Sequence, residues 1–311
     1  MKHLNWYVLV VMIFAIHIVS FAQKEKEVKV KIKEGTLYGT LTSVADKTKA
    51  PIVIIIPGSG PTDRNGNSML VQANSYRLLA EELAKEGIAS LRYDKLKIGK
   101  STSDVKEGEL QFENNVEQVN AWIDYLKKKK YTNIILIGHS EGSLIGMLAA
   151  QQRNVTKFIS LAGTGRSIDQ VLIEQIANQS PQFEKETTTL LKQLKEGEKV
   201  DDFSPELANL FRKSVQPYLI SWIKYSPKEE IGKLTIPVMI IHGSTDIQVT
   251  EKDAELQKEG NSKAELIIIK EMNHVLKEAN ENKEENMKTY YNPKLPLHEE
   301  LIPVLAKFIN R

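Results

Sequence analysis

The stretch Ile134-Ile135-Leu136-Ile137-Gly138-His139-Ser140-Glu141-Gly142-Ser143 decides the fold that this sequence predicts. Four consecutive apolar residues, mostly β-branched, are typical of a buried strand. A Gly-x-Ser-x-Gly turn follows them, and residues 144–150 then have the composition of a helix. This context is that of a nucleophile elbow, a sharp turn at which flanking side chains would collide with neighbouring backbone. We therefore predict that Ser140 is a nucleophile.

The composition is that of an ordinary globular protein. Of the 311 residues, 41% are hydrophobic and 26% are charged, and this length allows one large α/β domain with an insertion. The formal net charge of +2 gives no reason to expect nucleic acid or an anionic surface as a partner. Because the chain has no cysteine, disulfides, thiolate zinc sites and a cysteine nucleophile are excluded.

Residues 1–22 have the features of a secretory signal peptide. An apolar run extends from Trp6 to Val19, and Ser20 and Ala22 offer small residues at the two positions that a signal peptidase recognises. The alternative is an uncleaved membrane anchor, but the run is shorter than the roughly 20 apolar residues that a spanning helix needs. We expect cleavage near Ala22, export to the periplasm or the medium, and no stable membrane anchor.

The rest of the chain alternates between strand and helix patterns. Residues 28–33 and 36–44 predict an antiparallel hairpin at the edge of a larger sheet. Apolar runs predict strands at 51–56, 88–93, 134–137, 158–162, 237–243 and 265–269, and periodic apolar residues predict helices at 74–86, 112–130, 251–259 and 298–309, with a charged loop at 278–288. This alternation implies a mostly parallel, doubly wound α/β sheet with right-handed crossovers.

The strand–helix rhythm breaks between Gly163 and Leu234. No strand pattern occurs there, and apolar residues recur at helical spacing over residues 171–176, 190–194, 207–211 and 219–223. We expect a helical cap insertion at about residues 164–234 within a single domain of residues 23–311. The alternative is a helical decoration packed to one side of the sheet.

A serine nucleophile requires a base that takes its proton and an acid that orients the base. Asp246 and His274 each follow a predicted strand, at the sheet edge where open α/β folds place their sites. Together with Ser140 they occur in the chain order Ser…Asp…His. We predict that Asp246 is the acid and His274 the base, with Asp169 as the alternative acid one strand earlier.

Three other histidines are weaker candidates for the base. His298 lies at the start of a helix after a long loop, and His242 lies within a strand, where a packed imidazole is expected. His139 lies inside the elbow and is expected to point away from the site.

Two backbone N–H groups are expected to stabilise the oxyanion of an acyl-transfer reaction. One belongs to Glu141, which follows the nucleophile at the start of a helix. The other belongs to Ser59 in the Gly58-Ser59-Gly60 loop, with Gly60 as the alternative. The side chain of Glu141 is expected to be only a carboxylate at a helix start.

Six motifs occur in a fixed order along the chain: PGSGPTDRNGN, RYDK…GKS, GHSEGS, SLAGTGR, HGSTDIQV and MNHVLK. Together they resemble the motifs of α/β-hydrolase-fold carboxylesterases with a serine-aminopeptidase-like catalytic domain, in particular bacterial esterases with a GHSEG elbow. The resemblance extends from about residue 28 to the C-terminus. It departs from the family at Leu96-Lys97, because the related proteins usually read DKRGxGKS and carry Arg-Gly at these two positions.

The resemblance implies an α/β-hydrolase fold and assigns roles to five residues. These are Ser140 as nucleophile, Asp246 as acid, His274 as base, and Ser59 with Glu141 as the oxyanion hole.

No cofactor or metal is expected. The segment Gly99-Lys100-Ser101 ends like a phosphate-binding loop but lacks the required earlier glycine. The Gly58-Ser59-Gly60 loop begins like a dinucleotide fingerprint, but Asp63 stands where the third glycine belongs. Residues 63–67 lack the later ligands of a calcium loop.

These observations predict a serine carboxylesterase that hydrolyses short- to medium-chain acyl esters of small molecules through an acyl-enzyme. The alternatives are an exported serine peptidase or aminopeptidase of the same fold, and a non-catalytic binding protein that retains the fold.

Overall fold

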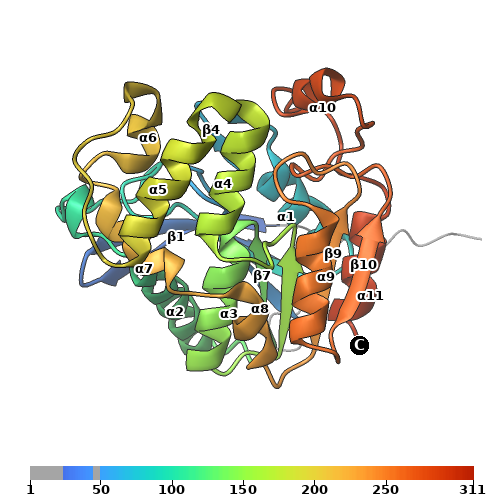
Figure 1. Ribbon diagram of the computed structural model, residues 1–311. Helices are drawn as coiled ribbons and strands as arrows, with labels where there is room; N and C mark the ends of the chain where they lie inside the picture. Colours follow the sequence, from blue (N-terminus) through green and yellow to red (C-terminus); the bar gives the residue numbers. More distant parts are fainter. Residues whose placement is uncertain (1–23, 45–49) are drawn as a thin grey trace, which may run out of the picture.

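The computed structural model describes residues 24–44 and 50–311, which include an eight-stranded sheet with helices on both faces (Figure 1). The strand order is β1-β2-β6-β3-β7-β8-β9-β10. These strands are β1 (Lys24–Ile32), β2 (Gly35–Ser43), β3 (Ile52–Ile56), β6 (Ala89–Tyr93), β7 (Ile134–His139), β8 (Lys157–Leu161), β9 (Val238–Gly243) and β10 (Glu265–Ile269). The predicted signal peptide, residues 1–22, lies outside the described residues.

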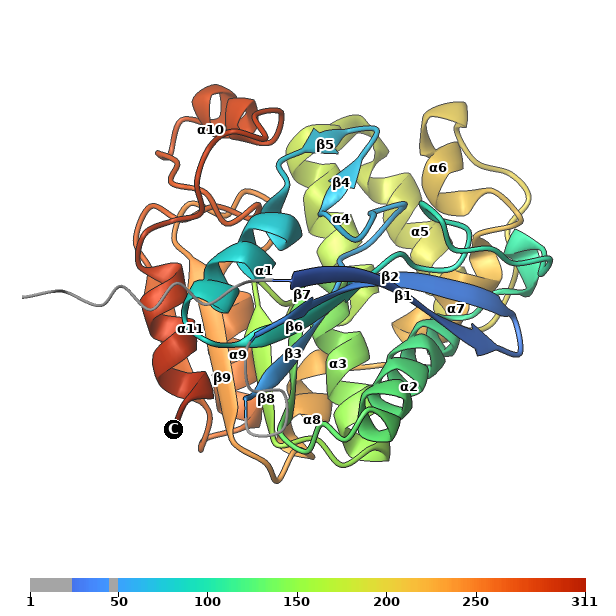
Figure 2. The same cartoon turned by 180° about the vertical axis from the view of Figure 1, so that it is seen from behind.

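The sheet has an antiparallel edge and a parallel body, as the sequence predicted. β1 pairs antiparallel with β2, and β2 pairs antiparallel with β6. All later pairings, from β6 through β3 and β7 to β10, are parallel. Figure 2 shows the hairpin extending from the sheet on this edge. Parallel strands place their carboxyl ends at one edge, so the loops after β3, β6, β7, β9 and β10 can meet there.

The position of strand β3 in the sheet explains why its sequence is apolar without alternation. Ile52, Ile54 and Ile56 belong to the apolar cluster on one face of the sheet, and Val53 and Ile55 belong to the cluster on the other. Successive side chains of a strand point to opposite faces, so a strand covered on both faces needs apolar residues throughout.

Helices cover the two faces unequally. One face packs against α2 (Phe112–Lys128), α3 (Glu141–Gln152), α8 (Pro227–Gly232) and α9 (Glu251–Gly260), and the other packs against α1 (Ser75–Lys85) and α11 (Leu301–Ile309). Both α1 and α11 are amphipathic, and their buried residues join the cluster around Val53 and Ile55.

Residues 163–234, here called the helical segment, contain no strand in the structure. They form α4 (Ile168–Gln179), α5 (Glu184–Lys195), α6 (Ala208–Phe211), α7 (Gln216–Ile223) and α8, with short 3₁₀ turns at Pro181–Phe183 and Pro205–Leu207. Helices α4, α5 and α6 lie on the side of the molecule toward which β7 points (Figures 1 and 2). That is the side on which the loops after the parallel strands lie.

Two local features differ from the sequence-based expectation. The predicted charged loop at residues 278–288 contains helix α10 (Lys283–Thr289), because the Asn282 side chain accepts hydrogen bonds from the N–H groups of Glu284 and Glu285 and caps it. A small hairpin of β4 (Asn67–Ser68) and β5 (Val71–Gln72) follows the glycine-rich loop after β3 and was not predicted.

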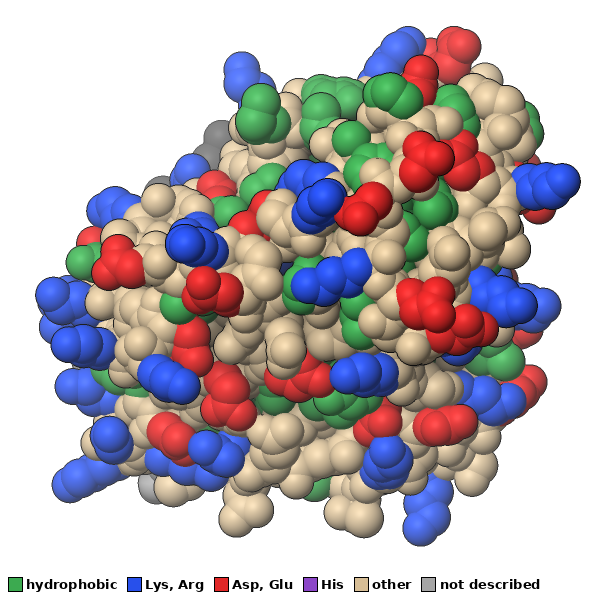
Figure 3. Space-filling model, turned by 60° about the vertical axis from the view of Figure 1, so that its left-hand side comes forward, with side chains coloured by type: hydrophobic (Ala, Val, Ile, Leu, Met, Phe, Trp, Pro, Cys, Tyr) green, Lys and Arg blue, Asp and Glu red, His purple; other side chains and the backbone are tan. Residues whose placement is uncertain are grey.

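The surface carries charges of both signs. Figure 3 shows Lys, Arg, Asp and Glu side chains interspersed over one face, in keeping with the small net charge of +2. Within residues 24–44 and 50–311, every helix is too short or too polar to cross a membrane.

Candidate active site

The elbow between β7 and α3 has the predicted geometry. Ser140 adopts φ 53° and ψ −123°, a conformation that costs energy for a residue other than glycine. A Cβ at Gly138 would lie 2.2 Å from the Gly142 carbonyl oxygen, and one at Gly142 would lie 2.4 Å from the Ile56 carbonyl oxygen. Both glycines are therefore required by close backbone contacts. The Ser140 N–H donates to the Leu161 carbonyl (3.0 Å), which ties the strained turn to β8.

Asp246 and His274 come together at the edge where β9 and β10 end. His274 Nδ1 lies 2.7 Å from Asp246 Oδ2, and the other oxygen, Oδ1, accepts from the N–H groups of Gln248 (2.8 Å) and Val249 (3.0 Å). Since the ionised carboxylate is acceptor-only, His274 carries its proton on Nδ1. Its Nε2 is then left with a lone pair, as a general base requires.

The surroundings of Asp246 keep it ionised. Burial on its own raises the pKa of this carboxyl group, but the neighbouring His274, the hydrogen bond from its ring, His242 and the Val249 N–H lower it by more. The pKa of Asp246 therefore lies below its usual value. The alternative acid, Asp169, lies at the start of α4 and pairs with Lys195 of α5 (2.8 Å), both in the helical segment.

The other candidate histidines have separate partners. His242 is fully buried, with Nε2 3.0 Å from the Val249 carbonyl and 3.8 Å from Asp246 Oδ2. The ring of His298 accepts from the Glu300 N–H through Nδ1 (3.3 Å).

His139 does not simply point away from the site, as the sequence suggested. Its Nδ1 lies 2.8 Å from Tyr76 Oη and its Nε2 lies 2.8 Å from the His274 carbonyl oxygen. The His274 carbonyl can only accept, so Nε2 carries the proton and donates to it. Nδ1 of the neutral ring then accepts from Tyr76 Oη, which itself accepts from the Gly58 N–H (2.9 Å). His139 thus links the backbone of His274 to the loop after β3.

The charge state of His139 agrees with this arrangement. Burial, followed by the neighbouring His274, lowers the pKa of His139 to about 3. A neutral imidazole can accept at one nitrogen and donate at the other, which both contacts require.

Gly58 brings the loop after β3 against Ser140. A Cβ at Gly58 would lie 3.2 Å from Ser140 Cβ, so the peptide that joins Gly58 to Ser59 passes beside the elbow. Among the described residues, neither the Ser59 N–H nor the Glu141 N–H donates to another group of the protein. These are the two backbone donors that the sequence analysis assigned to the oxyanion.

The Glu141 side chain has more contacts than a carboxylate at a helix start requires. It is 4% exposed and accepts a hydrogen bond from Tyr218 of α7 (2.6 Å). Lys95 Nζ lies 3.4 Å from its second oxygen and also donates to the Gly58 carbonyl (2.7 Å). Neither Lys95 nor Tyr218 was predicted to contact the site. Lys95 directly follows β6 at the same sheet edge as the other site residues, and this position was the available signal. Tyr218 gave none.

The loop after β6 has a tight shape at Leu96 and Lys97. Lys97 adopts φ 66° with an exposed side chain. Leu96 is buried, and its N–H donates to the Gln118 side chain (3.0 Å).

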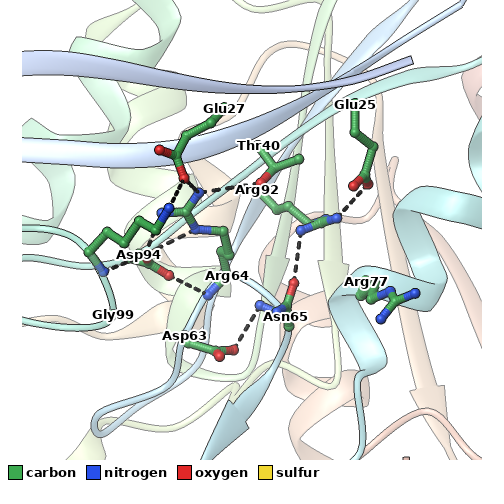
Figure 4. Close-up of a pocket in the computed structure, with 11 residues that line it drawn as sticks. Glu25, Glu27, Thr40, Asp63, Arg64, Asn65, Arg77, Arg92, Asp94 and Gly99 are labelled. Atoms are coloured by element: carbon green, nitrogen blue, oxygen red, sulfur yellow. Dashed lines mark hydrogen bonds and ion pairs between the residues drawn. The ribbon is translucent and has the colours of Figure 1, made fainter. Parts of the chain in front are cut away.

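A polar cleft of about 370 Å³ lies apart from Ser140, Asp246 and His274 (Figure 4). Arg64, in the loop after β3, donates to Asp94 from its backbone N–H and from its guanidinium group, at 2.6–3.0 Å. The charged groups of this cleft pair largely with one another. Its lining residues are Glu25, Glu27, Thr40, Asp63, Arg64, Asn65, Arg77, Arg92, Asp94, Gly99 and Lys100.

Within residues 24–44 and 50–311, no three His, Asp or Glu side chains gather in an arrangement that would hold a metal ion.

Comparisons with known proteins agree with the fold. Residues 69–206 match the family described as serine aminopeptidase, S33. Esterase EstD from Thermotoga maritima is 24% identical over an alignment of 271 residues. The match covers 81% of this chain and 60% of EstD, so the chain spans less than two thirds of that relative.

Solved structures of two esterases resemble this chain over most of their length. Est1E from Butyrivibrio proteoclasticus superposes with a TM-score of 0.58 at 20% identity, covering 92% of this chain and 99% of Est1E. The Pyrococcus furiosus esterase Pf2001 superposes with a TM-score of 0.59 at 19% identity, covering 94% of this chain and 92% of Pf2001. At these identities the likeness concerns the fold.

Proposed function

We propose that this chain, whose fold is that of the α/β-hydrolases, is a serine carboxylesterase. The observation that carries the proposal is the 2.7 Å contact between His274 Nδ1 and Asp246, at the same sheet edge as the strained Ser140. In this proposal Ser140 is the nucleophile, His274 the general base and Asp246 the acid that orients it. The names of EstD, Est1E and Pf2001 support esters as the substrate class.

The proposed reaction has two steps. His274 Nε2 takes the proton of the Ser140 hydroxyl while the serine oxygen attacks the ester carbonyl, and the Ser59 and Glu141 N–H groups stabilise the oxyanion. His274 then protonates the departing alcohol and leaves an acyl-enzyme. Water, deprotonated by His274, attacks this acyl group. The carboxylic acid product is then released, and His274 returns the proton to Ser140. Asp246 stays ionised and stabilises the imidazolium in both steps.

We also propose that the helical segment is a cap that helps bind the acyl group. An aromatic cluster joins it to α2: Phe112 stacks on Trp222 with ring centres 5.3 Å apart and meets Tyr218 edge-on. Tyr218 in turn reaches Glu141 next to the nucleophile. The segment therefore lies next to the elbow, and we propose short- to medium-chain acyl groups as the substrates.

The test of the proposal is Ser140→Ala against a chromogenic acetate ester. Its matched control is Ser143→Ala, because Ser143 lies on the same helix and, among the described residues, its hydroxyl hydrogen-bonds only with Ser160 (2.7 Å). We expect Ser140→Ala to lose at least about 10³-fold in kcat and its labelling by a fluorophosphonate, with Ser143→Ala retaining both. Wild-type turnover by Ser140→Ala would contradict serine catalysis, and an unlabelled, inactive wild-type protein would favour a binding protein.

A peptidase is the second candidate, because residues 69–206 match a family described as serine aminopeptidase. An aminopeptidase must bind the substrate's ammonium group, and a carboxylate is the usual partner. Glu141 is the carboxylate next to Ser140, and Lys95 and Tyr218 already occupy its oxygens. Aminoacyl nitroanilides beside esters of varied chain length decide between the two, and faster turnover of the anilides would favour the peptidase.

A further inference from the structure

The loop after β3 is held at Gly58 by side chains on both sides of its backbone. The Gly58 N–H donates to Tyr76 Oη (2.9 Å), and the Gly58 carbonyl accepts from Lys95 Nζ (2.7 Å). Both partners are buried, Tyr76 at 3% and Lys95 at 7% exposure. A glycine has no side chain to fix its own backbone, so these two contacts determine how the peptide after it is turned.

The geometry of a peptide bond converts the Lys95 contact into an orientation of Ser59. The Gly58 carbonyl and the Ser59 N–H belong to the same planar unit, and the described residues contain no cis peptide. In a trans peptide the carbonyl and the N–H point in opposite directions. When Lys95 holds the carbonyl on one side, the Ser59 N–H is therefore held on the other.

Lys95 is itself held by an acceptor from the elbow. Glu141 Oε2 lies 3.4 Å from Lys95 Nζ, and Glu141 Oε1 accepts from Tyr218 Oη (2.6 Å). Tyr218 Oη also accepts from Asn115 of α2 (2.8 Å), so its one proton is committed to Glu141. Glu141 also supplies the second backbone donor assigned to the oxyanion, so this ion pair joins the two halves of the oxyanion hole.

We propose that Lys95 is a positioning residue that orients the Ser59 N–H of the oxyanion hole, with Glu141 and Tyr218 keeping its ammonium group in place. The inference rests on the proposed function, because it concerns how the proposed serine esterase stabilises its oxyanion. Lys95 touches neither the ester nor the nucleophile in this role. It acts only through the Gly58 carbonyl.

The first experiment compares Lys95→Met with Lys97→Met, a control on the same loop whose exposed side chain contacts no site residue. Removing one oxyanion donor typically costs 10²–10³-fold in kcat, and a donor that is displaced rather than removed should cost less. We expect Lys95→Met to lose about 10- to 100-fold in kcat with KM within about twofold. Affinity for a trifluoromethyl ketone, which forms an oxyanion on Ser140, should fall by the same factor.

Two further variants separate positioning from mere folding. Lys95→Arg, which can still donate to the Gly58 carbonyl, should recover most of the lost kcat. Glu141→Gln keeps the shape and the Tyr218 contact but turns an amide N–H toward Lys95, so kcat and ketone affinity should fall together, about 3- to 10-fold. Glu141→Gln also serves if Lys95→Met fails to fold, and unchanged kinetics in it would then overturn the proposal.

Other outcomes are equally decisive. Folded Lys95→Met with wild-type kcat, an equal loss in Lys97→Met, or a loss confined to KM would each overturn the role of Lys95. Ser140→Ala is measured alongside: if it keeps its activity, the proposed function itself fails. If Ser140→Ala is inactive while Lys95→Met is normal, only the inference about Lys95 fails.

Discussion

Asp94 and Lys95 are neighbours in the chain, yet they hold opposite ends of the same loop, residues 57–67, in different ways. Asp94 accepts three hydrogen bonds from Arg64 and one from the Lys100 N–H, all at 2.6–3.0 Å. Lys95 makes one short contact to the Gly58 carbonyl and a longer one to Glu141. The Arg64 end is fixed by a dense, buried ion pair, whereas the Gly58 end is fixed by single contacts.

This difference separates stability from chemistry within a single loop. A buried carboxylate that meets a guanidinium group through two nitrogens is costly to break, because removing either partner leaves an unpaired charge. A single lysine contact to a carbonyl adds little to stability but determines the direction of one peptide. We therefore expect changes at the Arg64 end to act mainly on unfolding, and changes at the Gly58 end to act mainly on kcat.

Arg64→Met should have the largest effect on stability. It leaves Asp94 buried without its partner, and breaking a buried pair in this way typically costs about 3–5 kcal/mol of the free energy of unfolding. Urea unfolding measures this cost, with Arg77→Met as control, because the Arg77–Glu81 pair is largely exposed and should contribute less than about 1 kcal/mol. A loss below about 1 kcal/mol in Arg64→Met would remove the contrast between the two ends of the loop.

The Gly58 end should be more sensitive to acid, because it depends on neutral His139 through Tyr76. Burial lowers the pKa of His139 to about 3, so between pH 6.5 and 3 the unfolded chain binds a proton that the folded protein does not. Stability from this group is therefore full above pH 6.5 and is lost as the pH falls. From pH 7 to pH 5 the loss should be about 2 kcal/mol.

The variant His139→Gln isolates the contribution of His139 to the loss of stability at acid pH. Its amide can accept from Tyr76 and donate to the His274 carbonyl, but it cannot be protonated in this range. Urea unfolding at pH 7 and pH 5 should show that His139→Gln loses about 2 kcal/mol less than the wild type. An equal pH dependence in both proteins would show that His139 does not set the acid sensitivity.

Much of the fold followed from the sequence, because its strongest signals are local. The apolar runs of β3, β7 and β9 must be buried on both faces, and such strands predict a covered parallel sheet. The loop around α10 was harder, because seven residues from Lys283 to Thr289 carry a charged pattern without an apolar face. The helix depends on the Asn282 cap and on tertiary contacts that local periodicity does not record.

The candidate site, like the fold, was only partly predictable from the sequence. The candidates Ser140, Asp246 and His274 could be predicted because each follows a strand end. The structure places Asp246 against His274, and the catalytic roles of the three residues stay predictions. The buried partners of Glu141 could not be predicted, because Lys95 and Tyr218 lie 46 and 77 residues away from it. A carboxylate's burial depends on such distant contacts, so sequence position alone described Glu141 incompletely.

The smallest effect is expected at Lys97, which lies outside the loop of residues 57–67. Its φ of 66° costs a non-glycine residue roughly 1–2 kcal/mol, part of which glycine would return as greater freedom of the unfolded chain. Lys97→Gly should therefore raise the free energy of unfolding by up to about 1 kcal/mol, with kcat unchanged. Lys97→Ala is the control and should give no gain. A destabilised Lys97→Gly would show that the lysine side chain itself supports the loop.

Strand β1 has a consequence for how copies of this protein behave toward one another. It begins the strand order of the sheet and, among the described residues, pairs only with β2. An open strand edge can add a strand from another molecule and so start aggregation. Lys24, Lys26, Lys29 and Lys31 are all exposed along β1. The two acidic residues of the strand, Glu25 and Glu27, pair with Arg92 and Lys100, so two such edges that approach each other meet with an excess of positive charge. This edge, which has no second partner strand among the described residues, thus carries its own electrostatic protection against intermolecular sheet growth.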